Sequence, residues 1–369
     1  MLISTSGLMW SRIRLAFVGI SVVLATAACG SGAVQPPPPV PPSPVPPSPT
    51  APAPPRTPKA TAPEGSSVQQ LSGEVSDARA MKHLQALQKI ADEHGGNRAS
   101  GTAGYDASVD YVVGVLRRAG FKVSTPTYEA DQDRRSSGPQ RNVIAQTSTG
   151  DAGQVVMIGA HLDSVEDGPG IVDNGSGVAT LLEIATQLGD DPSVQNAVRF
   201  AFFGGEENGA EGSRAYVEGL SAGNRKKIKL YLNVDMVASP NGGYFVQGGE
   251  GRDAETAGPP GSATIGRVLA DQLTKTGVKT PEIIEFVGDD ESAFIEAGIP
   301  VGGAENGDAE RKTRQQAKAW GGQARVRYDR CYHDACDNID NVNRDVLDHY
   351  MRALAGTVAH FATSTAELR

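Results

Sequence analysis

Side chains of the kinds that bind metal ions follow three short apolar segments of the sequence. Each segment is rich in β-branched, aromatic or other apolar residues, which predicts strands buried on both faces; the segments are 155–160, 198–203 and 229–234. The groups directly after them are imidazoles or carboxylates, from His161 and Asp163, Glu206 and Glu207, and Asp235. Because ligands of open α/β sheets bind beyond the carboxyl ends of the strands, we expect these groups to meet at one sheet edge.

The available donors favour a metal site over other hydrolytic chemistry. The sequence has no G-x-S-x-G motif, which argues against a serine hydrolase, and no H-E-x-x-H motif, which excludes a thermolysin-like single-zinc helix. Two imidazoles and three carboxylates remain, from His161, Asp173, Glu207, Asp235 and His333. This set suits two zinc ions, each bound by one histidine and one carboxylate, with the third carboxylate shared. The glycine-rich segment 168–175 would let the backbone approach the ions closely.

Helical and strand-like segments alternate along the rest of the chain. One apolar helical stripe, which ends at a Gly-Gly pair, consists of Met81, Leu84, Leu87, Ile90 and Ala91. Further helices are expected over 109–116, 174–188, 262–276 and 342–361. This alternation predicts one α/β domain over 76–369, with a central mixed, mostly parallel sheet flanked by helices on both faces. We find no internal repeat and expect the catalytic domain to be monomeric.

Residues 1–28 have the features of a bacterial lipoprotein signal peptide. Arg12 and Arg14 precede an apolar run over 15–28, which is shorter than the ~20 residues of a membrane-spanning helix. Small residues then precede Cys29, which we expect to carry the lipid after cleavage; an ordinary signal peptide is the alternative. We therefore expect an exported, extracytoplasmic protein that Cys29 anchors to the cell membrane.

Residues 29–75 are expected to link this anchor to the domain. Proline dominates 35–63, and proline fixes φ and favours the extended polyproline II conformation. The segment therefore predicts a stiff spacer without a hydrophobic core.

The cysteine count bears on disulfide bonding, and the net charge bears on the class of binding partner. With Cys29 assigned to lipid, Cys331 and Cys336 remain, and such a pair in an exported chain predicts a disulfide. The net charge of -9 argues against a nucleic-acid partner, because binding phosphates needs clustered Lys and Arg.

Five motifs, in order along the chain, resemble the secreted two-zinc aminopeptidases of peptidase family M28, which include leucine aminopeptidases exported by bacteria. The motifs are His161-Leu162-Asp163-Ser164, the Gly-Ile-Val-Asp-Asn-Gly-Ser-Gly run at 170–177, Gly205-Glu206-Glu207, Asn233-Val234-Asp235-Met236 and Cys331-Tyr332-His333. Segments 298–303 and 320–322 are similar as well, so the resemblance covers roughly 78–361. It implies a zinc exopeptidase fold and an enzyme that hydrolyses the N-terminal bond of peptides with a free N-terminus.

The resemblance also implies a role for each motif residue. The implied zinc ligands are His161 and Asp235 for one ion, Glu207 and His333 for the other, and Asp173 as the bridge. The implied catalytic residues are Glu206 as the general base, Tyr332 as a hydrogen-bond donor to the oxyanion, and Asp163 behind His161, whose ring it would orient. A cis peptide bond between Asp173 and Asn174 is implied too.

One segment departs from the family pattern. Secreted bacterial members commonly carry a Ser-Asp pair with a basic residue close by, near the site that receives the substrate amine, whereas 288–292 reads Gly-Asp-Asp-Glu-Ser. The extra acid could bind a free α-amine directly, or it could change which N-terminal residue is preferred.

Alternative functions and roles stay open at this point. A glutaminyl-cyclase-like or carboxypeptidase-like zinc enzyme would share the fold, and an inactive peptide-binding lipoprotein would share the anchor. Asp163 could instead cap a turn, and Tyr332 could simply pack. The complete set of five ligands and the base favours the two-zinc aminopeptidase over these alternatives.

Overall fold

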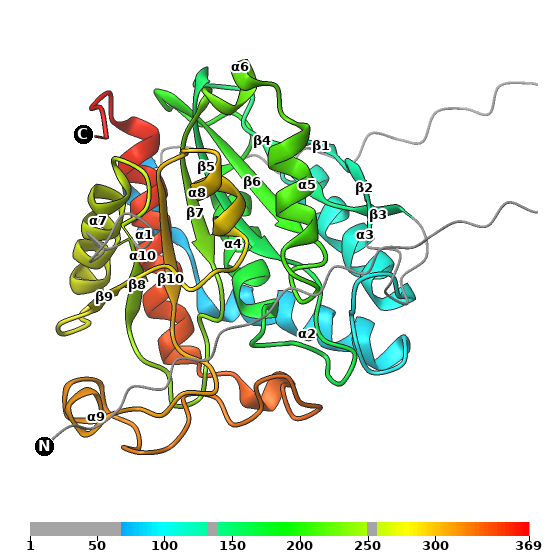
Figure 1. Cartoon of the computed structure of the whole chain (residues 1–369), viewed down its shortest axis with the longest axis vertical. Helices are drawn as coiled ribbons and strands as arrows, with labels where there is room; N and C mark the ends of the chain where they lie inside the picture. Colours follow the sequence, from blue (N-terminus) through cyan, green and yellow to red (C-terminus); the bar gives the residue numbers. More distant parts are fainter. Residues whose placement is uncertain (1–67, 131–138, 249–256, 369) are drawn as a thin grey trace, which may run out of the picture. The chain divides into compact units, whose positions relative to one another are not determined.

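The computed structural model describes residues 68–130, 139–248 and 257–368 (Figure 1). The expected signal peptide, the lipid site at Cys29 and the proline-dominated segment 35–63 lie outside the described residues. Within the described ranges, no helix combines the length and the apolar character that a membrane span requires.

Eight strands form the main sheet, and two short strands pair separately. The main sheet consists of β1 (Lys122–Ser124), β4 (Val143–Gln146), β5 (Asp151–His161), β6 (Asn196–Phe203), β7 (Ile228–Val234), β8 (Phe245–Gln247), β9 (Glu282–Ile284) and β10 (Val301–Glu305). The separate pair is β2 (Thr127–Glu129) and β3 (Pro139–Arg141). The strand order is β1-β4-β6-β5-β7-β10-β8-β9, with parallel pairing from β6 through β10 and antiparallel pairs at β1/β4, β4/β6 and β10/β8. The predicted mixed, mostly parallel sheet is confirmed.

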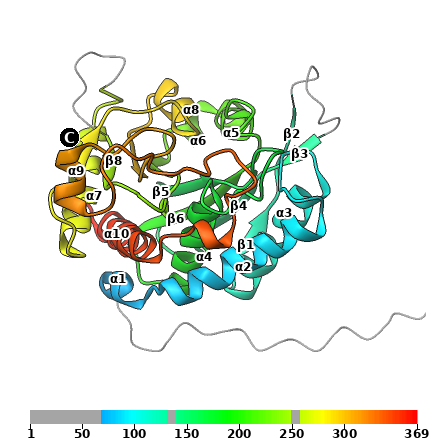
Figure 2. The same cartoon turned by 90° about the horizontal axis from the view of Figure 1, so that it is seen from below.

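Helices cover both faces of this sheet (Figure 2). One face packs against α1 (Leu71–Glu74), α2 (Asp77–Glu93), α3 (Ala103–Arg118), α4 (Gly175–Leu188), α7 (Ser262–Lys275) and α10 (Arg344–Thr363). The other face packs against α5 (Glu211–Gly219) and α8 (Glu291–Glu296). The remaining short elements are η1 (Val68–Gln70), α6 (Ala222–Arg225), α9 (Arg314–Trp320) and η2 (Ile339–Asn341). The sheet is therefore buried on both sides, which explains the continuous apolar runs of its central strands.

The expected helices are present, with small differences at their ends. The stripe of α2 buries Leu84, Leu87 and Ala91, and the helix ends before Gly95 and Gly96, which both have positive φ. The packed chain begins earlier than the expected boundary at residue 76, because Leu71 contributes a buried side chain to the same core as α10.

Candidate metal centre

The three strand ends that carry the candidate ligands are neighbours in the sheet. β5 lies between β6 and β7 and runs parallel to both, so their carboxyl ends meet at one edge. His161 is the last residue of β5, Glu206 and Glu207 follow β6 across a Gly-Gly turn, and Asp235 follows β7 directly. The structure thus brings together the side chains that the sequence predicted to meet.

Asp173 reaches this edge from the loop before α4, and Asn174 fixes the end of that loop. The Asn174 side chain caps α4 by accepting from the Gly177 N–H at 2.9 Å. It also donates to the Val234 carbonyl at 2.8 Å and accepts from the Met236 N–H at 3.3 Å. One side chain therefore holds the residues on both sides of Asp235 next to the backbone of Asp173. The expected cis bond between Asp173 and Asn174 is confirmed.

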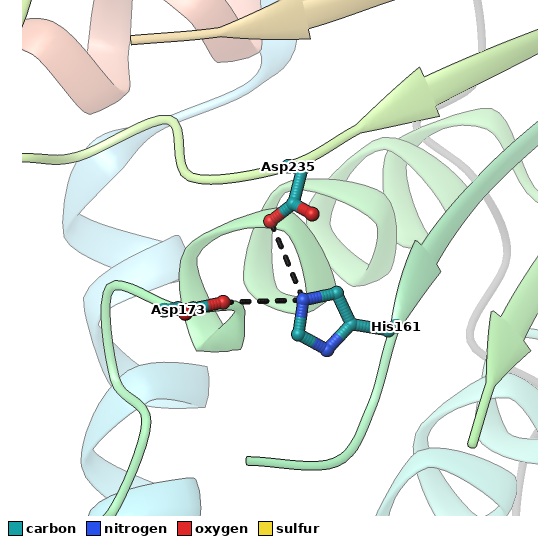
Figure 3. Close-up of side chains that lie close together, drawn as sticks. All are labelled: His161, Asp173 and Asp235. Atoms are coloured by element: carbon teal, nitrogen blue, oxygen red, sulfur yellow. Dashed lines mark ion pairs between the residues drawn. The ribbon is translucent and has the colours of Figure 1, made fainter. Parts of the chain in front are cut away.

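The first cluster of candidate ligands centres on one ring nitrogen of His161 (Figure 3). Its Nε2 lies 3.2 Å from Oδ1 of Asp173 and 3.4 Å from Oδ1 of Asp235. All three side chains are buried, and they come from β5, the loop before α4 and the end of β7. Three donors of this kind at such separations can hold one metal ion.

The second cluster uses the other oxygen of Asp173. His333 Nε2 lies 3.2 Å from Oδ2 of Asp173 and 3.1 Å from Oε2 of Glu207. Each carboxylate oxygen of Asp173 therefore faces a different histidine. All five candidate ligands fall into two groups that share Asp173.

Unpartnered buried atoms test whether these residues fit metal ions. Nε2 of His161, Oε1 of Glu207 and Oδ1 of Asp235 are buried and have no hydrogen-bond partner among the described residues. Leaving a buried polar atom unsatisfied costs about 1–3 kcal/mol, and a bound cation would satisfy all three atoms. Imidazole and carboxylate donors of this kind fit zinc.

Asp163 lies behind His161, as expected for a residue that orients the ring. The His161 Nδ1 is 3.2 Å from the Asp163 backbone carbonyl and 3.7 Å from its carboxylate Oδ1, so the backbone oxygen makes the shorter contact. In the neutral imidazole, donation of a hydrogen bond from Nδ1 would leave Nε2 unprotonated toward the cluster. The Asp163 carboxylate instead accepts from the Glu206 N–H at 3.3 Å, which links the two strand ends.

Negative charge dominates the electrostatics of the site. Burial raises the pKa of Glu206 to about 9; His161 opposes this shift, and the charges of Asp290, Asp235 and Asp163 add to it. Burial and Asp173 likewise raise the pKa of Glu207 to about 7. Bound cations would add positive charge here and favour the ionised form of both carboxylates.

The two clusters open into a cleft with a volume of about 560 Å³. Its polar lining consists of Asp173, Glu206, Glu207, Asp235, Asp289, Glu305, Asp308, Glu310, Tyr328, Tyr332 and His333, and its apolar lining includes Met236, Phe245, Ile284 and Val287. Among the described residues that line it, His333 is the only basic side chain. The cleft is therefore suited to a positively charged group on a ligand.

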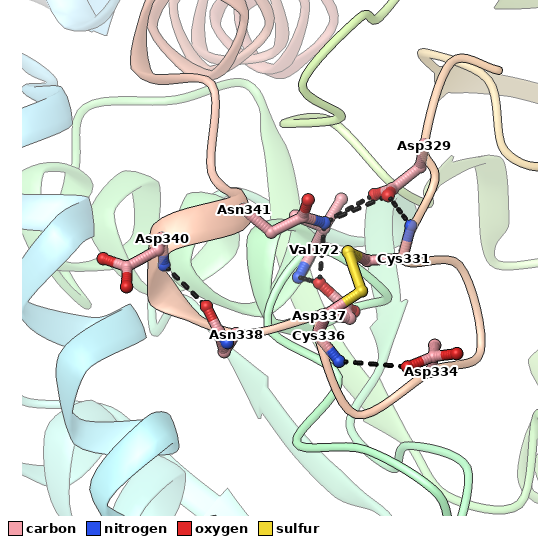
Figure 4. Close-up of a disulfide and its surroundings, with 9 residues drawn as sticks. All are labelled: Val172, Asp329, Cys331, Asp334, Cys336, Asp337, Asn338, Asp340 and Asn341. Carbon is pink, nitrogen blue, oxygen red and sulfur yellow. Dashed lines mark hydrogen bonds between the residues drawn. A yellow bond between two sulfur atoms is a disulfide. The ribbon is translucent and has the colours of Figure 1, made fainter. Parts of the chain in front are cut away.

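Tyr332 and His333 lie together on a segment that a disulfide closes. The predicted bond between Cys331 and Cys336 is confirmed (Figure 4). The Tyr332 ring stacks on the His333 ring with centroids 3.8 Å apart, and Tyr332 lines the cleft. Burial, with nearby carboxylates such as Asp173, raises the pKa of Tyr332 above its ordinary value, so its hydroxyl stays a proton donor.

Two buried charged residues that the sequence did not single out hold the loop of Asp173. Arg98 donates to the carbonyls of Pro169 at 2.9 Å and Gly170 at 2.6 Å, and to that of Leu162. The Asp337 carboxylate accepts from the N–H groups of Val172 at 2.9 Å and Asp173 at 3.0 Å. The position of Asp337 directly after Cys336 was the one signal that could have pointed to it.

Segment 288–292, which departs from the family pattern, contains three acidic residues, and one of them reaches the cleft. Asp289 lines it, whereas Asp290 and Glu291 are buried. Glu291 accepts from the Gly288 N–H at 2.9 Å, so its carboxylate shapes the turn that presents Asp289. The added acidity of the cleft therefore comes from Asp289.

The sequence matches a known peptidase family. The family model described as Peptidase family M28 matches residues 142–358. A relative from Mycobacterium tuberculosis (strain ATCC 25618 / H37Rv), named "Probable lipoprotein aminopeptidase LpqL", is 46% identical over 73% of this chain and 56% of its own length. The "Leupeptin-inactivating enzyme 1" of Streptomyces exfoliatus is 42% identical over 75% of this chain and 60% of its own length. The chain thus spans somewhat more than half the length of these relatives.

Solved structures show the same fold. A zinc aminopeptidase from Bacillus subtilis superposes with a TM-score of 0.61 at 16% identity, over 80% of this chain and 97% of that one. A glutaminyl cyclase from Porphyromonas gingivalis superposes with a TM-score of 0.58 at 22% identity, over 78% and 98%. The family model covers more than half of the sequence, and this chain therefore belongs to peptidase family M28.

Proposed function

We propose that this protein is an aminopeptidase that removes the N-terminal residue from peptides, using two zinc ions and Glu206 as its general base. The observation that carries the proposal is Asp173, whose two carboxylate oxygens face His161 and His333 at 3.2 Å each. A carboxylate shared in this way suits a pair of ions at the floor of a cleft.

Each residue then has a separate task. His161 and Asp235 would hold one zinc ion, Glu207 and His333 the other, and Asp173 both. When bound, the ions would lower the pKa of a water molecule and polarise the substrate carbonyl. Glu206 would accept a proton from that water and return it to the leaving amine. Tyr332 would donate a hydrogen bond to the oxyanion.

The charge of the cleft supports an N-terminal over a C-terminal substrate end. Eight carboxylate residues line it, and no Lys or Arg is found among its described lining residues. A free α-amine is a cation and would be attracted, whereas a C-terminal carboxylate would be repelled. This disfavours the carboxypeptidase alternative, and Asp289 is placed to bind the amine or to affect the choice of N-terminal residue.

A glutaminyl cyclase would share the fold but would catalyse a different reaction. The complete donor set for two ions favours hydrolysis, and a decayed binding protein would be expected to lack a ligand or the base. A defined peptide that begins with glutamine, analysed by mass spectrometry, distinguishes these functions. Loss of one N-terminal residue supports the proposal, loss of ammonia indicates cyclisation, and an unchanged peptide indicates a binding protein.

The proposal includes an extracytoplasmic place of action. Cys29 and the residues before it fit a lipidation site, and the relative from Mycobacterium tuberculosis is named a lipoprotein. The proline-rich segment would hold the catalytic domain away from the membrane.

A further inference from the structure

One side chain ties together the two ends of the segment that carries Tyr332, His333 and the disulfide (Figure 4). The Asn341 amide nitrogen donates to the two carboxylate oxygens of Asp329 at 3.1 and 2.8 Å, and to Oδ1 of Asp337 at 3.3 Å. Asp329 and Asp337 are buried, so little water can replace this donor.

Each of these two carboxylates holds a part of the second cluster. Asp329 accepts from the Cys331 N–H at 2.7 Å, which fixes the start of the segment that presents His333. Asp337 accepts from the Val172 and Asp173 N–H groups at 2.9 and 3.0 Å, and its backbone carbonyl accepts from a third N–H of the same loop at 3.1 Å. Asn341 therefore connects the segment of His333 to the backbone of Asp173.

The two clusters differ in how strongly the rest of the fold supports them. His161 lies at the end of β5, which is paired on both sides. His333 lies outside the sheet, its side chain is 40% exposed, and its φ is +58°. A residue other than glycine stays in this left-handed region only where its surroundings hold it. The second cluster thus depends on the segment between Asp329 and Asp337.

We propose that Asn341 is a positioning residue of the second zinc site. By joining Asp329 to Asp337 it sets the distance between the His333 imidazole and the Asp173 carboxylate, and with it the zinc affinity of that site. The inference rests on the two-zinc site of the proposed function. The first cluster shares only Asp173 with this network, and neither His161 nor Asp235 is a hydrogen-bond partner of Asn341, so its zinc affinity should change much less than that of the second cluster.

Zinc titration of the metal-free mature chain, followed by isothermal titration calorimetry, tests the proposal. Asn341→Asp keeps the size of the side chain but replaces its donor with a third carboxylate. We expect the second zinc to bind roughly 10–100-fold more weakly, as is typical when a partner behind a metal ligand is lost, and the first within about twofold of wild type. Asn338→Asp is the matched control, because it adds the same charge nearby while its side chain caps only the Asp340 N–H, at 2.9 Å.

Exchanging donor and acceptor provides a rescue. In Asp329→Asn/Asn341→Asp the amide at 329 can donate to the carboxylate at 341, so part of the second-site affinity should return. If Asn341→Asp is unfolded by circular dichroism, Asn341→Ser is titrated instead, with the same expectation. If both zinc ions bind the variant equally more weakly, or if both affinities are unchanged, the inference about Asn341 is wrong, while the two-zinc proposal is unaffected. A wild-type chain that binds a single zinc would overturn the two-zinc proposal as well.

Discussion

Glu206 and Glu207 are adjacent in sequence but occupy different positions in the site. Oε2 of Glu207 is 3.1 Å from His333, within the second cluster. Oε2 of Glu206 is 4.0 Å from Nε2 of His161, and the backbone N–H of Glu206 donates to the Asp163 carboxylate. This separation allows one carboxylate to bind metal while the other accepts a proton.

Replacing the two glutamates should separate these roles. Glu206→Gln is expected to lower kcat on leucine p-nitroanilide by about 10²–10⁴-fold, because the amide cannot accept the proton, while two zinc ions stay bound. Glu207→Gln should instead release one zinc. Turnover and zinc content, the latter by atomic absorption, are measured on both variants. Near-normal turnover of Glu206→Gln, or zinc loss equal to that of Glu207→Gln, would show that the roles are assigned wrongly.

Among single residues, the sequence revealed the candidate metal ligands but not the residues that hold those ligands in place. His161, Glu207 and Asp235 could be identified because they follow strands whose apolar pattern is visible in the sequence. Arg98 and Asp337 could not, because the backbone groups of the Asp173 loop that they hold lie more than 60 residues away in sequence. Hydrogen bonds to a distant backbone leave no spacing pattern that a single sequence can show.

The sequence also predicted some of the helices and strands and missed others. Strands β5, β6 and β7 and the long helices were predicted, since each carries an apolar pattern of sufficient length. Strands β8 and β9 have three residues each, and β10 contains two adjacent glycines, so their propensity for strand is weak. They form because β10 pairs with β7, β8 with β10 and β9 with β8, and this tertiary effect brings Phe245, Ile284 and Glu305 to the cleft.

The contact between α2 and α3 predicts a pH dependence of stability. Burial, assisted by the positive charge of Arg118, lowers the pKa of His83 to about 4, while its Nδ1 lies 2.7 Å from the Tyr111 hydroxyl. Between pH 6.5 and about 4 the unfolded chain therefore binds a proton at His83 that the folded chain does not. The stability that comes from keeping His83 neutral is fully present above pH 6.5 and is lost as the pH falls from 6.5 to about 4.

His83→Gln should reduce this pH dependence. Glutamine can hydrogen-bond Tyr111 but does not titrate, so the slope of the unfolding free energy against pH should fall by at most about 1.4 kcal/mol per pH unit. Urea unfolding of wild type and variant at pH 7 and pH 4.5 measures the change. His94→Gln, at the C-terminal end of α2, serves as the control. Parallel pH profiles for wild type and His83→Gln would contradict the prediction.

At the scale of the whole molecule, the N-terminal segment predicts where the enzyme acts. Cys29→Ala should prevent lipid attachment, so that the mature protein no longer partitions with membranes while the zinc site is unaffected. Fractionation of cells that express each form, followed by immunoblotting, measures the distribution. Retention of Cys29→Ala in the membrane fraction would indicate a different anchor.

The proposed function requires two zinc ions to act together at the edge of this sheet. Its most direct test adds zinc stepwise to the metal-free protein and measures hydrolysis of leucine p-nitroanilide after each addition. Because Asp173 serves both clusters at 3.2 Å, activity should rise through the second equivalent of zinc and reach its plateau at two per chain. A plateau at one equivalent, or no hydrolysis at any zinc content, would contradict it.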